Sequence, residues 1–248
     1  ENKEYSAVRG STEAPFLNAL ADQYGLAERY FANTHPSLPN YLDLVAGRDF
    51  GIDDDGEGYV LRGRTLVDQL EANGLTWGAF MEGMARDRTA PCRFPSRGAY
   101  RKKHNPFAYF ARIQRRTGRC RSILPFRRFP GALATGLPNL TWITPNTCHD
   151  MHDCSVATGD RWLRRFLPPL LKLANTAVFI VFDEGDESDH TGGGGHIPAL
   201  AVGPTVRPGA RARASLNHYS LLRTIEDAWG LRKLGSSAGA QPIVGIWR

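Results

Sequence analysis

The sequence predicts an α/β layer fold with a mainly parallel sheet flanked by helices, because strand-like and helix-like segments alternate along it. Two short runs, LTWITP (140–145) and AVFIVF (177–182), are apolar and rich in β-branched and aromatic residues, as buried parallel strands are. Polar residues follow each run directly. At 248 residues the chain can form one large domain, and we expect a single domain over 1–248.

Further elements follow from spacing and end signals. Four segments have helical spacing: FLNALADQYG (16–25), TLVDQLEANG (65–74), RWLRRFLPPLLKL (161–173, up to its proline pair) and NHYSLLRTIEDAWG (217–230). Gly25, Gly74 and Gly230 end three of them, and Asn217 is a plausible N-cap for the last. Strands are expected at TWGAFM (76–81) and IPALAV (197–202), whereas 84–130 is rich in Arg, Pro and Gly and predicts a loop-rich basic excursion.

The stretch HPSLPNY (35–41) holds a serine between two prolines. Pro36 restricts the approach to Ser37, and Pro39 suits the first turn of a helix that continues through Tyr41. Ser37 is therefore expected at or just before a helix N-terminus, where free N–H groups favour an anion. The alternative is that Ser37 is only an N-cap.

Composition describes an ordinary globular protein, with 42% hydrophobic and 23% charged residues and no apolar run long enough to span a membrane. The net charge is +6, and much of the excess lies in 112–129. A basic patch can bind nucleic acid, anionic lipid or acidic substrates. No nucleic-acid module signature accompanies it, so a solvated surface and no specific nucleic-acid partner are expected.

Four cysteines are present. Neither Cys92 and Cys120 nor Cys148 and Cys154 have the close spacing of a zinc ribbon. The simplest pairing is Cys92–Cys120 and Cys148–Cys154, which implies an oxidising compartment. No basic, apolar leader opens the sequence, and we expect a secreted or extracytoplasmic protein from which a signal peptide has been removed.

Polar residues gather after the predicted strands. AVFIVF runs into Asp183 and Glu184, and ligands of open α/β sheets bind outside the carboxyl ends of strands. Two adjacent carboxylates there repel each other unless a cation compensates, and oxygen ligands favour Mg²⁺, Mn²⁺, Ca²⁺ or Zn²⁺. The alternative is that these acids cap loops or pair with arginines. After LTWITP comes a second polar group: Asn146, His149, Asp150, His152 and Asp153.

Three other motifs resemble known functional motifs but lack parts of their signatures. The run GGGGHIP (192–198) places His196 before a strand, but lacks the GK[ST] of a P-loop, so it is either a flexible linker or part of the site. The acidic GIDDDGEGY (51–59) lacks the spacing of an EF-hand and predicts a solvated loop. GSSAG (235–239) matches a nucleophile elbow, but neither an acid nor a histidine follows it, which excludes a serine hydrolase of that order.

Several motifs together resemble the bacterial phosphoesterase family, which contains acid phosphatases and phospholipases C of the alkaline phosphatase superfamily. The motifs, in chain order, are ENKEYS, HPSLPNY, HNPF, TPNTCHDMHDCSVATGDRWL, VFDEG, GHIP and NHYSLLRTIEDAWGL. The resemblance runs from Glu1 to about Ile243. It implies an alkaline-phosphatase-like α/β sandwich and a divalent-metal phosphohydrolase with a hydroxyl nucleophile.

By motif, the resemblance assigns metal ligation to two pairs, Glu1 with Asn2 and Asp183 with Glu184. Ser37 resembles the superfamily nucleophile, and Asn40 matches the asparagine that follows it. The remaining expected site residues are Asp150 for metal, His104 and Asn146 for substrate, and His149, His152 and His196 for proton transfer.

The expected activity is hydrolysis of a phosphomonoester through a phosphoserine intermediate, because the longer phospholipase members carry C-terminal modules for which this sequence has no room. A phospholipase C or phosphodiesterase is the alternative within the family. A sulfatase is disfavoured because the C/S-x-P-x-R signature is missing around Ser37. Outside the enzymes, a secreted polyanion-binding protein could use the arginine-rich stretch. The expected partner is a small phosphorylated substrate or a phospholipid head group.

Overall fold

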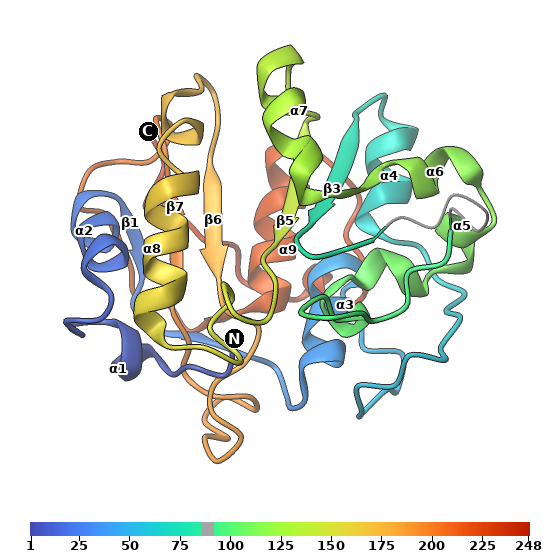
Figure 1. The fold of residues 1–248 in the computed structure, drawn as a ribbon. Helices are drawn as coiled ribbons and strands as arrows, with labels where there is room; N and C mark the ends of the chain where they lie inside the picture. Colours follow the sequence, from blue (N-terminus) through green and yellow to red (C-terminus); the bar gives the residue numbers. More distant parts are fainter. Residues whose placement is uncertain (86–91) are drawn as a thin grey trace.

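The computed structural model describes residues 1–85 and 92–248, and Figure 1 shows strands in the middle of the molecule with helices around them. The strands are β1 (Gly25–Ala27), β2 (Tyr30–Phe31), β3 (Trp77–Met81), β4 (Ile123–Pro125), β5 (Leu140–Thr144), β6 (Val178–Val181), β7 (Ala199–Val202), β8 (Arg211–Ala212) and β9 (Leu216–Asn217). The α-helices are α1 (Tyr5–Val8), α2 (Pro15–Gln23), α3 (Ser37–Ala46), α4 (Leu66–Ala72), α5 (Ala111–Gln114), α6 (Thr117–Arg121), α7 (Phe129–Thr135), α8 (Val156–Phe166) and α9 (His218–Ala228). The 3₁₀ turns are η1 (Lys102–His104), η2 (Pro106–Tyr109), η3 (Phe126–Arg128), η4 (Leu170–Lys172) and η5 (Gly235–Ala238).

The described strands form three ladders, in the orders β6-β7-β1-β8, β2-β9 and β4-β3-β5. Four of the strand pairs are parallel: β1 with β8, β2 with β9, and β3 with both β4 and β5. The α/β class and the mainly parallel pairing are therefore confirmed. β6 was expected to be a buried parallel strand, and this is wrong: it pairs antiparallel with β7, and its residues are only half-buried. An apolar run predicts a strand, but not the direction of its partner.

Most predicted elements are present. α4 and α9 lie within their predicted segments, and α2 begins one residue earlier than predicted, at Pro15. The N-cap of α9 is Asn217, whose side chain accepts from the Ser220 N–H. Thr65 and Asp68 form a capping box that starts α4. α8 begins at Val156, earlier than the predicted start at 161. Its Asp160 accepts hydrogen bonds from the backbone N–H groups of Phe16 and Leu17 at 3.2 and 2.8 Å, which caps α2 from a distant part of the chain.

The expected excursion over 84–130 returns to the sheet before its predicted end, because β4 lies within it and pairs with β3. The disulfide Cys92–Cys120 ties the segment together. Residues 86–91 of this prediction lie outside the described part of the chain.

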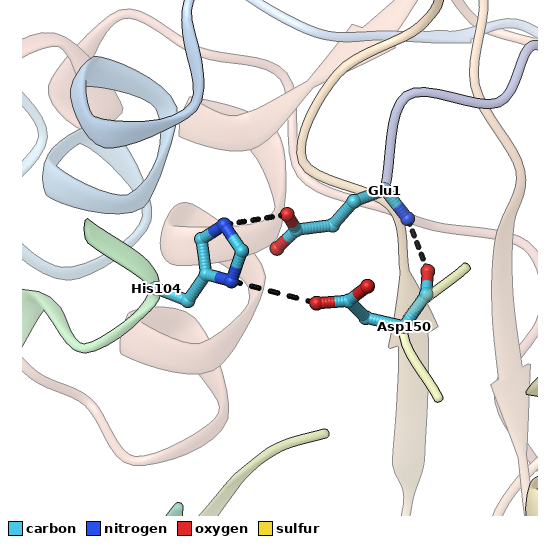
Figure 2. Close-up of side chains that lie close together, drawn as sticks. All are labelled: Glu1, His104 and Asp150. Carbon is cyan, nitrogen blue, oxygen red and sulfur yellow. Dashed lines mark hydrogen bonds and ion pairs between the residues drawn. The ribbon is translucent and has the colours of Figure 1, made fainter. Parts of the chain in front are cut away.

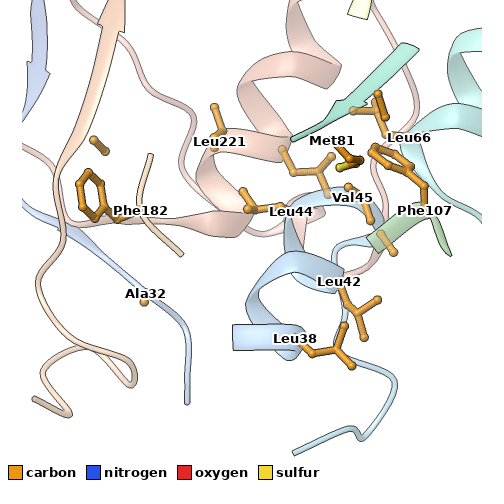
Figure 3. Close-up of a cluster of buried hydrophobic side chains, with 14 of the residues drawn as sticks. Ala32, Leu38, Leu42, Leu44, Val45, Leu66, Met81, Phe107, Phe182 and Leu221 are labelled. Carbon is orange, nitrogen blue, oxygen red and sulfur yellow. The ribbon is translucent and has the colours of Figure 1, made fainter. Parts of the chain in front are cut away.

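Helix α3 runs through the main hydrophobic core, and all ten of its residues are buried. Figure 3 shows Leu42, Leu44 and Val45 of this helix among side chains from several other elements. Met81 comes from the end of β3 and Leu221 from α9. Burial on all sides fixes the helix rigidly, so the residue at its N-terminus has a well-defined position.

Candidate active site

Ser37 is the first residue of α3, as the two prolines predict. Pro36 precedes the helix in an extended conformation, and Ser37 is fully buried. Its hydroxyl donates a hydrogen bond to Oε1 of Glu184 at 2.7 Å. A hydroxyl held beside a carboxylate at a helix N-terminus is placed to act as a nucleophile towards an anionic substrate.

The loop before Ser37 is held by Asn40. The side-chain oxygen of Asn40 accepts from the N–H groups of Asn33 and Thr34 at 3.0 and 3.2 Å. Its amide nitrogen donates to the carbonyls of Thr34 and Pro36 at 2.7 and 3.2 Å. These bonds use both ends of the amide, so in this structure Asn40 positions the loop; its expected contact with substrate stays a prediction.

Asp183 and Glu184 follow β6, and Phe182 lies between the strand and the pair. Both oxygens of Asp183 are buried and have no hydrogen-bond partner among the residues that the structure describes. Burial, reinforced by the charge of Glu1, raises the pKa of Asp183 well above its ordinary value. A buried carboxylate with two free oxygens is a position that a cation would stabilise.

Glu184 is the point at which several polar groups meet. Besides the Ser37 hydroxyl, Oε1 accepts from Nδ2 of Asn2 at 3.4 Å, and Oε2 lies 2.5 Å from Nδ1 of His35. The other ring nitrogen of His35 lies 3.0 Å from the carbonyl of Asp189. An ionised Glu184 and a backbone carbonyl are both acceptors, so this pair of contacts favours the doubly protonated form of His35. Burial lowers the pKa of His35, but its bonds to Asp189 and Glu184 raise it more.

Glu1, His104 and Asp150 form a second cluster, which Figure 2 shows. Nε2 of His104 lies 2.7 Å from Oε2 of Glu1, and Nδ1 lies 3.4 Å from Oδ2 of Asp150. The amino group of Glu1 donates to the carbonyl of Asp150 at 2.5 Å, and the Tyr41 hydroxyl of α3 donates to Oε1 of Glu1. Burial opposes charge here, yet His104 holds the pKa of Glu1 below its ordinary value, and Glu1 and Asp150 raise that of His104.

The donor atoms of this second cluster fit a metal ion. One ligand atom from each of Glu1, His104 and Asp150 lies within 4.8 Å of the others, and all three residues are buried. In the first cluster, the side-chain oxygen of Asn2 and both oxygens of Asp183 are buried, and within residues 1–85 and 92–248 they have no hydrogen-bond partner. Carboxylate, amide and imidazole donors are those that Mg²⁺, Mn²⁺ and Zn²⁺ accept.

The loop after β5 contributes Asp150 to this cluster, and the neighbouring polar residues of the loop make other contacts. The side-chain oxygen of Asn146 accepts from the N–H groups of Cys148 and His149, which makes a local turn. Nδ1 of His149 lies 2.9 Å from Oε2 of Glu82, and Nδ1 of His152 lies 2.7 Å from Oδ1 of Asp153. The His152 ring centroid is 6.1 Å from that of His104. The expected roles of Asn146, His149 and His152 stay predictions.

The disulfide Cys148–Cys154 closes this loop, and Cys92–Cys120 is also formed. Both predicted pairings are therefore confirmed. The short covalent loop holds Asp150 in place next to Glu1.

His196 belongs to the strand framework more than to the site. Its ring stacks on Tyr5 with centroids 4.4 Å apart, and Nε2 donates to the carbonyl of Glu28 at 2.9 Å. Among the described hydrogen bonds, none joins His196 to Ser37. Its predicted catalytic role has no contact that supports it here.

The glycine run before His196 is packed, so it is no flexible linker. A Cβ on Gly193 would overlap the carbonyl of Asn33, and one on Gly194 the carbonyl of Thr34. Only glycine permits such close backbone approach. The run therefore supports the loop that carries Ser37.

Sequence reasoning missed several residues of the site. His35 lies within the HPSLPNY stretch and Tyr41 one helical turn after Ser37, but nothing local marked either as a neighbour of a carboxylate. His218 also escaped notice: it is buried, and its Nε2 donates to the carbonyl of Asp183 at 2.6 Å. Burial lowers the pKa of His218 to about 4, so this histidine is neutral and fixes the backbone of Asp183.

Among the described residues, none of the helices has the length and apolarity needed to span a bilayer.

The chain matches the model of the Phosphoesterase family over residues 10–232. A phosphatidylinositol-3-phosphatase of Mycobacterium tuberculosis is 35% identical over 254 aligned positions, covering 100% of this chain and 80% of the relative. A phosphate-repressible acid phosphatase of Penicillium chrysogenum is 33% identical over 230, covering 88% of this chain but only 55% of the relative.

Among solved structures, a protein of the alkaline phosphatase superfamily from Vibrio parahaemolyticus matches with a TM-score of 0.57 and 12% identity, over 94% of this chain and 65% of that one. This likeness shows the fold, an alkaline-phosphatase-like α/β sandwich. The family match covers residues 10–232, which is most of the sequence. The chain belongs to the phosphoesterase family, whose members are hydrolases of phosphoric ester bonds.

Proposed function

We propose that this protein is a secreted, divalent-metal-dependent phosphomonoesterase that uses Ser37 as its nucleophile. One observation carries the proposal: the Ser37 hydroxyl, at the N-terminus of a wholly buried helix, donates to Glu184 next to the unpartnered carboxylate of Asp183. The similarity to enzymes named phosphatidylinositol-3-phosphatase and acid phosphatase supports a monoester substrate.

In the proposed reaction Ser37 Oγ attacks phosphorus in line with the leaving oxygen. The P–O bond to the leaving group breaks, a phosphoserine forms, and water then releases inorganic phosphate and regenerates the serine. The Ser37 proton is directed at Oε1 of Glu184, which is its acceptor in this structure. The helix N-terminus adds positive electrostatic potential where the phosphoryl oxygens would lie.

A divalent ion, held by Asn2, Asp183 and Glu184 with Glu1 nearby, would neutralise phosphoryl charge and lower the pKa of the serine hydroxyl. Within the chain itself, His35 holds Oε2 of Glu184, and His218 holds the backbone of Asp183. These contacts orient the two carboxylates before any ligand binds.

The leaving oxygen needs a proton, and His149 and His152 are the candidates. Both lie on the loop that carries Asp150, and both are partly exposed, so a substrate can reach them. Glu82 orients His149 through Nδ1, which leaves Nε2 to face solvent or substrate. The two disulfides support an oxidising, extracytoplasmic location.

The test is release of p-nitrophenol from p-nitrophenyl phosphate by wild type and by Ser37→Ala. We expect the variant to lose on the order of 10³-fold or more in kcat, because a nucleophile that is removed is not replaced by binding alone. Ser188→Ala, which changes an exposed serine bonded only locally to Asp186, is the matched control and should keep full activity.

Thermal unfolding of both variants should resemble that of wild type. A Ser37→Ala protein that is folded and retains a tenth or more of wild-type activity would show that Ser37 is not the nucleophile. Full wild-type activity in excess chelator would show that no divalent ion takes part.

A further inference from the structure

The acidic loop 51–59, predicted to be solvated, reaches the catalytic helix through one residue. Asp53 and Asp54 are exposed as expected, but Asp55 is only 30% exposed. Its Oδ1 accepts a hydrogen bond from the backbone N–H of Leu38 at 3.0 Å, and Leu38 directly follows Ser37. Its Oδ2 accepts from Nζ of Lys103 at 2.7 Å. Asp55 therefore ties a lysine to the N-terminus of α3.

Lys103 comes to this place through the turn η1 (Lys102–His104), which also supplies His104 to the Glu1 cluster. The lysine side chain is 17% exposed, so its ammonium group is held and not free in solvent. The ammonium group pairs with Asp55, whose other oxygen binds the residue that follows Ser37. The next residue along the turn, His104, contacts Glu1, so the lysine is held between the Ser37 helix and the Glu1 cluster.

An ammonium group has three N–H donors, and in the described part of the chain Lys103 gives one of them to Asp55. Two donors remain for a ligand. The two clusters hold four buried acids, Glu1, Asp150, Asp183 and Glu184, against two histidines, His35 and His104. A cation placed beside such a set serves to attract a second negative charge that a single divalent ion does not neutralise.

A phosphate monoester carries about two negative charges near neutral pH, because its second pKa is about 6. A phosphodiester carries one. We propose that Lys103, positioned by Asp55 against the N-terminus of α3, binds the additional charge of a monoester and so selects monoesters over diesters. This inference rests on the proposed phosphoesterase function of the Ser37 site.

The experiment compares kcat/KM for p-nitrophenyl phosphate with kcat/KM for bis(p-nitrophenyl) phosphate. In Lys103→Met we expect the monoester value to fall on the order of 10- to 100-fold and the diester value by about threefold or less. Lys103→Arg should keep most of the preference because it keeps the charge. Asp55→Asn, which can still accept from Leu38 but no longer pairs ionically with the lysine, should lose part of it.

Two controls separate the charge from loop anchoring. Lys102→Met removes an equal charge from the residue before Lys103. Nζ of Lys102 donates to the carbonyl of Glu57 in the acidic loop 51–59 at 2.5 Å. This variant should leave the preference for monoesters over diesters unchanged. The double variant Lys103→Met/Asp55→Asn removes the lysine without leaving an unpaired acid, and it should behave like Lys103→Met. If Lys102→Met shifts the preference as much as Lys103→Met, the lysine only anchors the loop.

Calorimetric titration with inorganic phosphate gives a second readout that needs no turnover. We expect the affinity of Lys103→Met for phosphate to fall about tenfold or more relative to wild type, with Lys102→Met unchanged. The inference would be overturned if folded Lys103→Met kept both the wild-type preference for monoesters and the wild-type affinity for phosphate. Wild type that hydrolyses neither ester would overturn the proposed function instead, and the phosphate titration would still decide whether Lys103 binds the anion.

Discussion

Asp183→Asn is the sharpest test of a metal at this site, because the substitution keeps the shape of the side chain and removes its charge. The Asp183 side chain is almost fully buried, and neither oxygen has a hydrogen-bond partner in the described part of the chain. Burial, together with the charge of Glu1, raises its pKa. In the metal-free protein this carboxylate is therefore a cost to stability, and it becomes favourable only when a cation binds. The variant should be at least as stable as wild type in chelator.

The size of the effect follows from linkage. A ligand present at about 100 times its Kd stabilises the folded state by about 2.7 kcal/mol, and each kcal/mol raises the Tm of a chain of this length by about 2–4 °C. Wild type should therefore gain about 5–10 °C on addition of the correct ion after chelation, whereas Asp183→Asn should gain less than about 2 °C at the same concentration.

The assay is scanning calorimetry with Mg²⁺, Mn²⁺, Ca²⁺ and Zn²⁺ added one at a time to chelated protein. Asp186→Asn is the control, since Asp186 is an exposed acid three residues away whose side chain accepts hydrogen bonds from Ser188. Equal gains in wild type and Asp183→Asn would refute a ligand role for Asp183, and no gain with any of the four ions in wild type would refute the metal site itself.

Three further predictions concern the surroundings of the site. Burial raises the pKa of Asp43 in α3 from 3.8 to about 7; hydrogen bonds from Asn33 and Tyr219 oppose this shift, and the charge of Asp49 adds to it. The folded state therefore holds this proton more tightly than the unfolded chain, so the free energy of unfolding falls as pH rises from about 4 to about 7. Asp43→Asn should remove up to about 4 kcal/mol of that decline, measured by urea unfolding at both pH values. An unchanged decline in the variant would contradict the buried acid. Cys148→Ser/Cys154→Ser should lower the free energy of unfolding by about 2 kcal/mol, because the disulfide closes only a short loop. It should lower phosphatase activity further than this loss of stability explains, because Asp150 loses its fixed position. Activity equal to wild type in the folded variant would show that the loop needs no covalent closure. Gly194→Ala should destabilise by about 1–3 kcal/mol because its Cβ would meet the backbone of Thr34, whereas Gly239→Ala, with open space around it, should be neutral in the same unfolding experiment.

The parts of the fold that the sequence predicted well are those with local causes. Gly74 and the Thr65–Asp68 capping box bound α4, and Asn217 caps α9, so each helix could be placed from its own residues. The position of Ser37 at a helix N-terminus followed from the two prolines in the same way. Whether β6 pairs parallel or antiparallel depends on β7, which the β6 sequence does not encode.

The site was predicted where the chain itself concentrates polar residues, as at Asp183–Glu184. Its supporting contacts could not be predicted, because they join residues far apart in sequence: His35 and Glu184 are 149 positions apart, and Glu1 and Tyr41 are 40 apart. His104 was expected to contact substrate, and the structure places it between Glu1 and Asp150. The local sequence, a histidine after two lysines, does not indicate that each ring nitrogen faces a buried carboxylate.

Helix α3 explains why the two clusters act as one site. Ser37 and Tyr41 are four residues apart, so they lie on the same face of the helix, one turn from each other. Ser37 bonds Glu184 in the first cluster and Tyr41 bonds Glu1 in the second. Asp55 adds the Lys103 charge to the N-terminus of the same helix through Leu38. Because α3 is packed on every side, it cannot shift to suit one cluster without moving the other. The nucleophile, the carboxylates on both sides and the lysine are therefore held in one fixed arrangement by a single buried helix.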